Sequence, residues 1–118
     1  MTSGTLRIVL LVETLSFVLA SLIHSGLIVP GYQHPQARTA EGIIAAVLLL
    51  GLVWGGLRPA SLRKAALTVQ WFALLGTVIG IFTIAVGVGP RTAPDLGYHI
   101  TMVVALIGGL QLAGKIQA

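Results

Sequence analysis

The sequence predicts an all-α, polytopic membrane protein: a four-transmembrane-helix up-down bundle that forms a single transmembrane domain, residues 1–118. Hydrophobic residues make up 56% of the chain and charged residues only 8%, whereas soluble domains carry about 25% charged residues. Four apolar segments have roughly the 20 residues that a helix needs to cross a bilayer. None of them alternates between apolar and polar residues, and each is about twice as long as a barrel strand. The pattern therefore favours helices.

The first two predicted helices form a hairpin of residues 6–29 and 40–57. Pro30 and Gly31 break the first apolar run, because neither residue readily continues a helix. The polar segment that follows ends at Thr39, whose hydroxyl is suited to cap the free backbone N–H groups of the second helix. This segment is therefore expected to be the loop of the hairpin.

The last two predicted helices form a second hairpin, of residues 65–88 and 95–115. A short basic turn, residues 58–64, precedes it, and residues 89–94 form its proline-containing loop. Thr92 and Asp95 are three residues apart at the start of the final helix, the spacing of a capping box. The second hairpin therefore has a clearer helix start than the first.

Basic residues are unevenly distributed between the two sides of the predicted bundle. The side with both termini has five of them: Arg7, Arg58, Arg63, Lys64 and Lys115. The other side has Arg38 and Arg91. The positive-inside rule therefore predicts a multi-pass protein of the cell (inner) membrane with both termini in the cytoplasm. The lipid bilayer is the expected partner, and nucleic acid is not, because the basic residues form no single patch.

Polar and ionisable side chains are predicted to meet at the outer mouth of the bundle: His24, His34, Glu41, Asp95, Tyr98 and His99. Imidazole and carboxylate groups suit zinc, copper or iron ions, and three His with one Glu are enough ligands for one metal ion. One hypothesis is a metal site that uses His24, Glu41, His99 and His34. Asp95 and Tyr98 would not bind the metal ion but would orient the side chains that do. No HxxxH or HExxH motif fixes the geometry.

The same side chains have other interpretations. Asp95 fits a helix cap, Glu41 in a first helical turn favours the helix dipole, and Tyr98 fits the aromatic belt of a membrane interface. His24 and His99 could instead hold a b-type haem between two helices, which leaves no sequence motif; this is the less favoured cofactor. A crevice for a quinone or lipid is a further alternative.

Glu13 is a carboxyl group inside the first apolar segment, where a charge costs roughly 2.5–3.5 kcal/mol on insertion scales. It precedes His24 by eleven residues, so both side chains share one face of a helix. That face must look into the bundle. Gln70 starts the third helix at a similar depth, with Thr68 and Thr77 as further partners. Glu13 and Gln70 are therefore predicted to form an intramembrane proton or hydrogen-bond site, either a structural clamp or a station for protons.

These patterns favour a small binding or transport protein, with a transition-metal site or with proton-coupled binding of a small solute. The competing hypothesis is a structural or accessory subunit of a larger membrane complex. Small residues four positions apart, such as Gly109 and Ala113, predict close helix packing, either within one chain or in a homo-oligomer. An enzyme is disfavoured, because the chain contains no recognisable nucleophile motif or phosphate loop and no cysteine.

Overall fold

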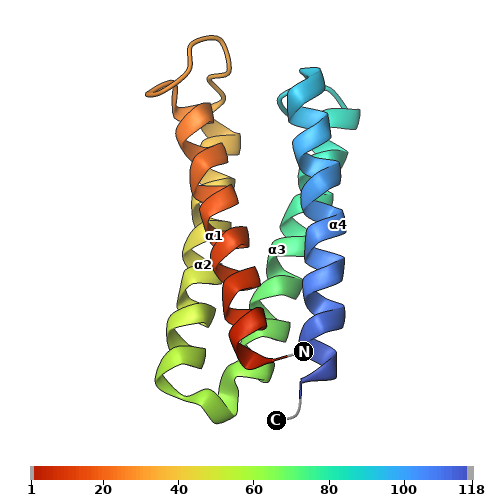
Figure 1. Ribbon diagram of the computed structural model, residues 1–118. Helices are drawn as coiled ribbons and strands as arrows, with labels where there is room; N and C mark the ends of the chain where they lie inside the picture. Colours follow the sequence, from red (N-terminus) through yellow and green to blue (C-terminus); the bar gives the residue numbers. More distant parts are fainter. Residues whose placement is uncertain (1, 117–118) are drawn as a thin grey trace.

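The structure is a computed structural model that describes residues 2–116, and it consists of four long helices (Figure 1). Their bounds are α1 Ser3–Ser25, α2 Pro35–Leu57, α3 Leu62–Ala85 and α4 Ala93–Lys115, with a short 3-10 helix, η1 Pro59–Ser61, between α2 and α3. No strand occurs among the described residues. All four helices are long and apolar enough to cross a membrane. The predicted fold class, an all-α four-helix bundle of the multi-pass membrane type, is confirmed.

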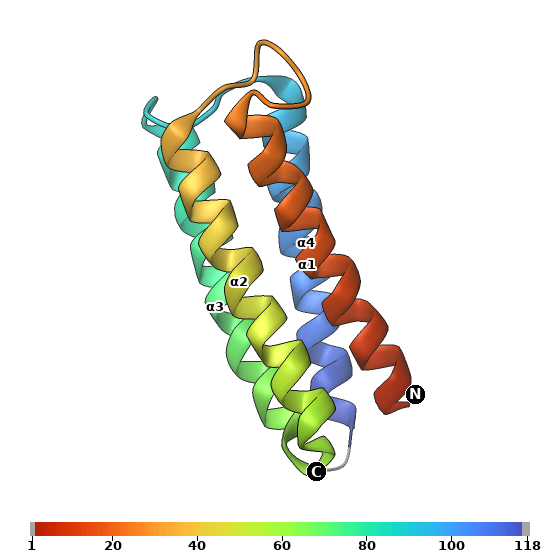
Figure 2. The same ribbon diagram turned by 90° about the vertical axis from the view of Figure 1, so that its left-hand side faces the viewer.

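The four helices run alternately up and down, so that both chain ends and η1 lie at one end of the bundle (Figures 1 and 2). We call this the terminal end. The opposite end, with the loops of residues 26–34 and 86–92, is the distal end. Consecutive helices pack closely along the chain, whereas α1 and α4 make the fewest contacts of the neighbouring pairs. The bundle is therefore closed least tightly between its first and last helices.

The first hairpin corrects two predicted helix ends. Helix α1 ends at Ser25, four residues earlier than expected, because Gly26 takes a left-handed φ of 81° and caps it, a conformation that glycine adopts at little cost. Helix α2 begins at Pro35, and the His34 side chain accepts a hydrogen bond from the N–H of Ala37. Proline suits the first helical position. Thr39, the expected N-cap, therefore lies inside α2.

The second hairpin agrees better with its prediction. Thr92 caps α4, and Thr92 and Asp95 bond each other reciprocally in the predicted capping box. Helix α3 begins at Leu62 and ends at Ala85, each three residues earlier than expected, and α4 begins at Ala93, two residues earlier than expected.

A glycine in α2 lets α3 approach closely, because a Cβ on Gly51 would lie 2.6 Å from Val69 Cγ2. Close packing of this kind is expected where lipid removes the hydrophobic drive between helices.

Polar side chains lie inside the bundle, and large apolar ones cover its outside. The buried polar and charged residues are Glu13, Thr14, His24, Glu41, Gln70, Thr77, Asp95 and His99. Trp71, Val104 and Leu50 are examples of apolar side chains that are more than half exposed, as lipid-facing residues would be. The prediction that Glu13 and His24 share an inward face is confirmed, since they are 2% and 4% exposed.

Candidate functional site

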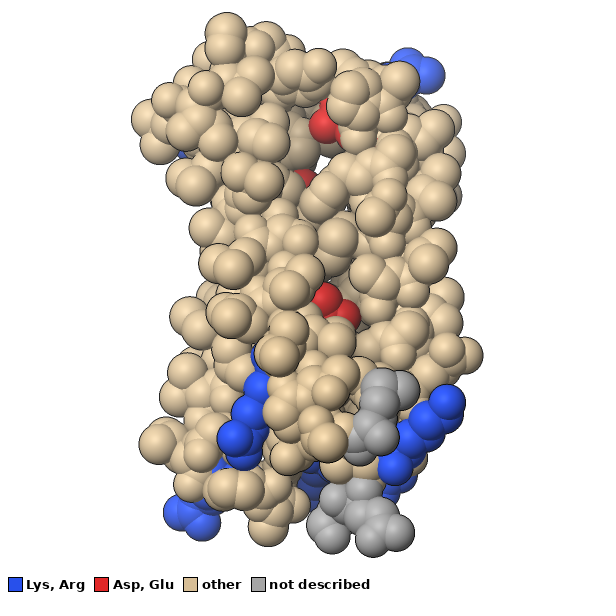
Figure 3. All heavy atoms as spheres, viewed as in Figure 1, with Lys and Arg blue, Asp and Glu red and all other residues tan. Residues whose placement is uncertain are grey.

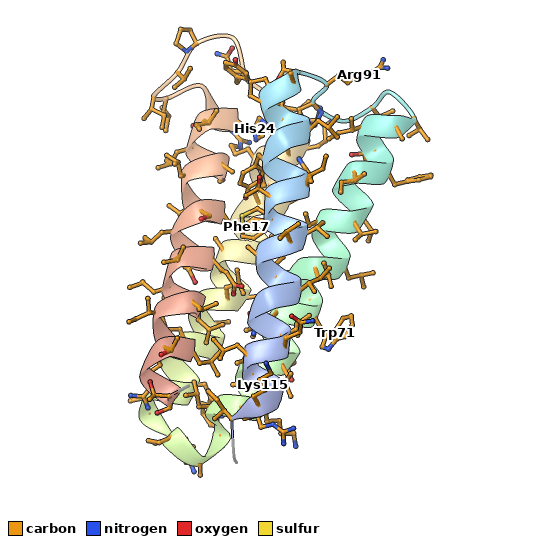
Figure 4. All side chains as sticks on the ribbon, turned by 45° about the vertical axis from the view of Figure 1, so that its right-hand side comes forward. Phe17, His24, Trp71, Arg91 and Lys115 are labelled. Atoms are coloured by element: carbon orange, nitrogen blue, oxygen red, sulfur yellow. The ribbon has the colours of Figure 1, made fainter. Side chains whose placement is uncertain are left out.

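His24 joins three helices at the distal end of the bundle. Its Nδ1 lies 2.6 Å from Glu41 Oε1 on α2, and its Nε2 lies 2.8 Å from Asp95 Oδ1 on α4. All three side chains are buried, and Figure 4 shows His24 pointing from α1 into the bundle, above Phe17. We call His24, Glu41 and Asp95 the distal triad. The contact links residues 71 positions apart in the chain, so it depends on the fold.

The two hydrogen bonds of the distal triad account for two protons. Each bond between an imidazole nitrogen and a carboxylate oxygen needs one proton, whichever of the two atoms carries it. A doubly protonated His24 between two carboxylates has a net charge of −1. A neutral His24 with one protonated carboxyl group has the same charge. With these two protons alone the distal triad is a buried anion, and a third proton on Glu41 would make it neutral.

Asp95 is the fixed end of the distal triad. Its Oδ2 accepts hydrogen bonds from the backbone N–H of Thr92 at 3.2 Å and from the Thr92 hydroxyl at 2.5 Å. These bonds belong to the capping box of α4. A negative side chain at this end of a helix also interacts favourably with the helix dipole. Both oxygens of Asp95 are thus satisfied. This carboxylate is therefore held by its own helix as well as by His24 of α1.

Glu41 is the open end of the distal triad. Its Oε2 is buried and has no hydrogen-bond partner within residues 2–116, and the same is true of the Tyr98 hydroxyl. His99 Nδ1 lies 2.7 Å from the backbone oxygen of Asp95, so Nδ1 carries the proton and the Nε2 of a neutral His99 is an acceptor. Two acceptors and one hydroxyl therefore remain available on this side.

The residues that carry these groups line a cavity of about 290 Å³ between α2, α3 and α4, which we call the distal cavity. Glu41, Tyr98 and His99 line it together with mainly apolar residues such as Ile44 and Val88. A second hollow of about 190 Å³, between α1 and α4, is lined by His24 and Asp95. The distal triad therefore lies between two hollows, with Glu41 facing the larger one.

The side chains predicted as metal ligands meet only in part. His24 and Glu41 are in direct contact, but both nitrogens of His24 are bonded to carboxylates, which leaves none for a metal ion or a haem iron. His34 is also fully bonded, because Nδ1 accepts from Ala37 and Nε2 donates to the Val88 carbonyl at 3.1 Å. Within the described part of the chain, no group of three His or acidic residues is arranged to hold a metal ion.

Two predicted supporting residues have different partners from those expected. The Asp95 carboxylate bonds His24, and only its backbone oxygen contacts His99. Tyr98 packs edge-on against Phe17, with ring centroids 5.9 Å apart. Glu41 lies about two turns inside α2, because α2 starts at Pro35. Its carboxylate is therefore a hydrogen-bond partner of His24. It does not lie in the first turn of α2, where it would interact with the helix dipole.

Glu13 and Gln70 meet closer to the terminal end. Both are buried, at 2% and 0% exposed, and their side chains crowd the point where a Cβ on Gly109 would lie. Thr77 and Thr68, considered as further partners of Glu13, bond carbonyl oxygens of their own helix instead. We call Glu13, Gln70 and Gly109 the inner site. Figure 3 shows acidic atoms recessed between α1 and α4, away from the basic atoms at the terminal end.

Comparison of the chain with protein-family models, with curated proteins and with solved structures found no match. The fold and the two buried polar sites are therefore the observations from which its function can be argued.

Proposed function

We propose that this protein binds a small, largely apolar cation in the distal cavity, at Glu41 Oε2, in competition with a proton. The observation that carries this proposal is the buried Oε2 of Glu41, which has no hydrogen-bond partner among residues 2–116 and belongs to a side chain that lines the distal cavity. A buried acceptor without a donor costs roughly 1–3 kcal/mol, and more if it is charged. A ligand that supplies a donor there removes this cost.

The charge of the distal triad favours a cation over an anion or a neutral molecule. The triad has a net charge of −1, and the exposed Arg38 and Arg91 are not paired with any carboxylate among residues 2–116. Two unit charges of opposite sign that lie about 4 Å apart attract each other by about 4 kcal/mol at an effective dielectric constant of 20. An anion in the distal cavity would be repelled by a similar amount.

The size and lining of the distal cavity limit the ligand further. A volume of about 290 Å³ is at the lower limit for small-molecule sites, and suits a molecule of about one ring. The apolar lining suits an apolar body, while Glu41 with Tyr98 and His99 offers one polar corner. The tyrosine hydroxyl and the His99 Nε2 would orient the charged group of such a ligand.

The proton is the natural competitor, because protonated Glu41 can no longer accept a hydrogen bond at the oxygen that carries the proton. The titratable groups around Glu41 are His24 from α1, Asp95, Tyr98 and His99 from α4, and His34 on the wall of the same cavity. Exchange of a proton for a cation at one carboxylate is the coupling that proton-driven uptake or export of small solutes requires. This supports proton-coupled solute binding more than a metal site, since the nitrogens of His24 are already bonded.

The distribution of charge supports an orientation with both termini in the cytoplasm. The terminal end has five basic residues: Arg7, Arg58, Arg63, Lys64 and Lys115. The distal end has two, Arg38 and Arg91, and the side with more Lys and Arg is the cytoplasmic one by the positive-inside rule. We infer that the distal cavity lies in the outer half of the membrane, where a ligand enters from outside the cell.

The test uses benzylammonium as the cation, with benzyl alcohol and benzoate as neutral and anionic probes of the same shape. Isothermal titration of the purified full chain in detergent should show saturable binding of benzylammonium, weaker binding of benzyl alcohol and none of benzoate. Glu41→Gln should weaken benzylammonium binding by about tenfold to a hundredfold, since a hydrogen bond to a charged group contributes roughly 1.5–3 kcal/mol.

Glu13→Gln is the matched control, because it makes the same chemical change outside the distal cavity and should leave the affinity unchanged. Acidification should weaken binding to the native protein, and this dependence should disappear in Glu41→Gln. Equal affinity of the native and Glu41→Gln proteins for benzylammonium, or tight binding of benzoate, would refute the proposal.

A further inference from the structure

The inner site contains hydrogen-bond acceptors and no donor for them. Neither carboxyl oxygen of Glu13 has a partner among the residues that the structure describes, nor does Oε1 of Gln70. The two recorded ion pairs both involve His24, so no basic side chain of residues 2–116 neutralises Glu13. An ionised carboxylate and an amide oxygen in this arrangement would repel each other in the buried interior of the bundle.

The orientation of the Gln70 amide is set by its own helix. Its Nε2 donates to the carbonyl oxygen of Ala66 at 3.1 Å. Rotation of the amide by half a turn would place Oε1 against that carbonyl, with two acceptors in contact and no proton between them. The amide oxygen is therefore directed away from Ala66, towards the position where Glu13 and Gly109 meet.

We propose that the inner site binds a proton: Glu13 is a neutral carboxylic acid, and its O–H donates to Gln70 Oε1. One proton then satisfies both partners. The acid oxygen becomes a donor, the amide oxygen receives it, and the helices α1 and α3 are joined without a buried charge. The site is separate from the distal triad, since the buried Phe17 lies between Glu13 and His24 on the same face of α1.

A proton suits the inner site better than a metal ion does. Hard cations such as calcium or magnesium take about six or more oxygen ligands, whereas the unpartnered oxygens of the inner site, among residues 2–116, are the two of the Glu13 carboxyl group and Oε1 of Gln70. A proton needs one donor and one acceptor. The site also has a single ionisable side chain, so one proton makes it neutral.

Gly109 provides the space for this pair. A Cβ at this position would lie 2.7 Å from Glu13 Oε2 and would collide with Gln70 Oε1. The neighbouring Gly108 faces open space, with no atom within 4 Å of its Cβ position. The two adjacent glycines therefore differ in function: only Gly109 lets the acid and the amide meet between α1, α3 and α4.

Infrared difference spectroscopy tests the proposal directly. The spectrum of the native protein minus that of Glu13→Gln, at neutral pH, should contain the C=O stretch of one protonated carboxyl group, shifted in heavy water. Gln70→Leu should move this band to higher frequency, as expected for an acid that has lost its acceptor. The control Gln111→Leu changes an exposed glutamine of α4 and should leave the band in place.

The glycine pair supplies the second measurement. Gly109→Ala should shift or remove the carboxylic-acid band, whereas Gly108→Ala should leave it unchanged. Carboxylate stretches alone in the native-minus-Glu13→Gln spectrum would show that Glu13 is ionised and would overturn the proposal. Equal spectra of the two alanine variants would also contradict it. Neither result depends on binding of a cation at Glu41, so this site and the proposed function fail separately.

Discussion

Two glutamates lie inside the same bundle, yet their surroundings offer them different hydrogen-bond partners. Glu41 contacts an imidazole that can supply a proton and a positive charge, whereas Gln70, which meets Glu13 at the inner site, presents an oxygen there. Both side chains are almost equally buried, at 5% and 2% exposed. Burial alone therefore does not decide whether a membrane carboxyl group is charged. The donors and acceptors that its neighbours offer decide it.

The largest effect is expected for His24→Ala, which breaks the distal triad at its centre. Glu41 and Asp95 would lose their shared donor and would both remain buried, and removal of one partner from a buried ion pair costs about 3–5 kcal/mol. The free energy of unfolding can be measured by titration with SDS in mixed micelles, followed by circular dichroism. Leu22→Ala on the lipid-facing side of α1 is the control. An equal loss of unfolding free energy in both variants would show that the hydrogen bonds of the distal triad do not stabilise the protein.

A smaller loss is expected for Glu41→Gln, which keeps the shape of the side chain and removes its charge. His24 would keep a hydrogen bond but lose a charged partner, and bonds to charged groups are worth about 1.5–3 kcal/mol. The same unfolding titration measures the loss. A stability equal to that of the native protein would mean that Glu41 is not ionised, and would remove the contrast with Glu13.

Thr92→Ala should cost about 1 kcal/mol, the usual value of an N-cap. Thr92 both caps α4 and donates to Asp95 Oδ2, so the variant tests whether the capping box holds the fixed end of the distal triad. Thr92→Ser retains the hydroxyl and should restore stability. If the serine variant is as unstable as the alanine variant, the lost methyl group and not the hydrogen bonds explains the effect.

The smallest effect is expected for Glu13→Gln, within about 0.5 kcal/mol of the native protein, the range of substitutions that break no important interaction. A glutamine amide N–H can replace the acid O–H as the donor to Gln70 Oε1. This is the same substitution that should be costly at Glu41. A loss of stability at Glu13 that matches the loss at Glu41 would show that both carboxyl groups are ionised.

The sequence predicted the four helices, because each apolar run is long enough to cross a bilayer as a helix and none alternates between apolar and polar residues. It also predicted the Thr92–Asp95 cap, which depends on residues three apart. It missed the ends of the first hairpin, although Gly26 and Pro35 are the residue types that end and begin helices. Those signals were outweighed by an apolar run that continues to Val29.

The composition of the two polar sites was predicted better than their internal contacts. Depth along each helix placed His24, Glu41 and Asp95 at one end, and Glu13 near Gln70. Which atoms meet depends on the rotation of each helix about its axis, and hydropathy gives little information about this rotation when every face is apolar. The bond from His24 to Asp95 and the role of Gly109 therefore required the structure.

His34 links the two loops of the distal end. Its Nδ1 accepts a hydrogen bond from the N–H of Ala37 at the start of α2, and its Nε2 donates to the Val88 carbonyl in the other loop. One imidazole therefore connects the two hairpins beside the distal cavity. Because one ring nitrogen must accept and the other must donate, the closure of the two loops over the cavity depends on a single tautomer of this side chain.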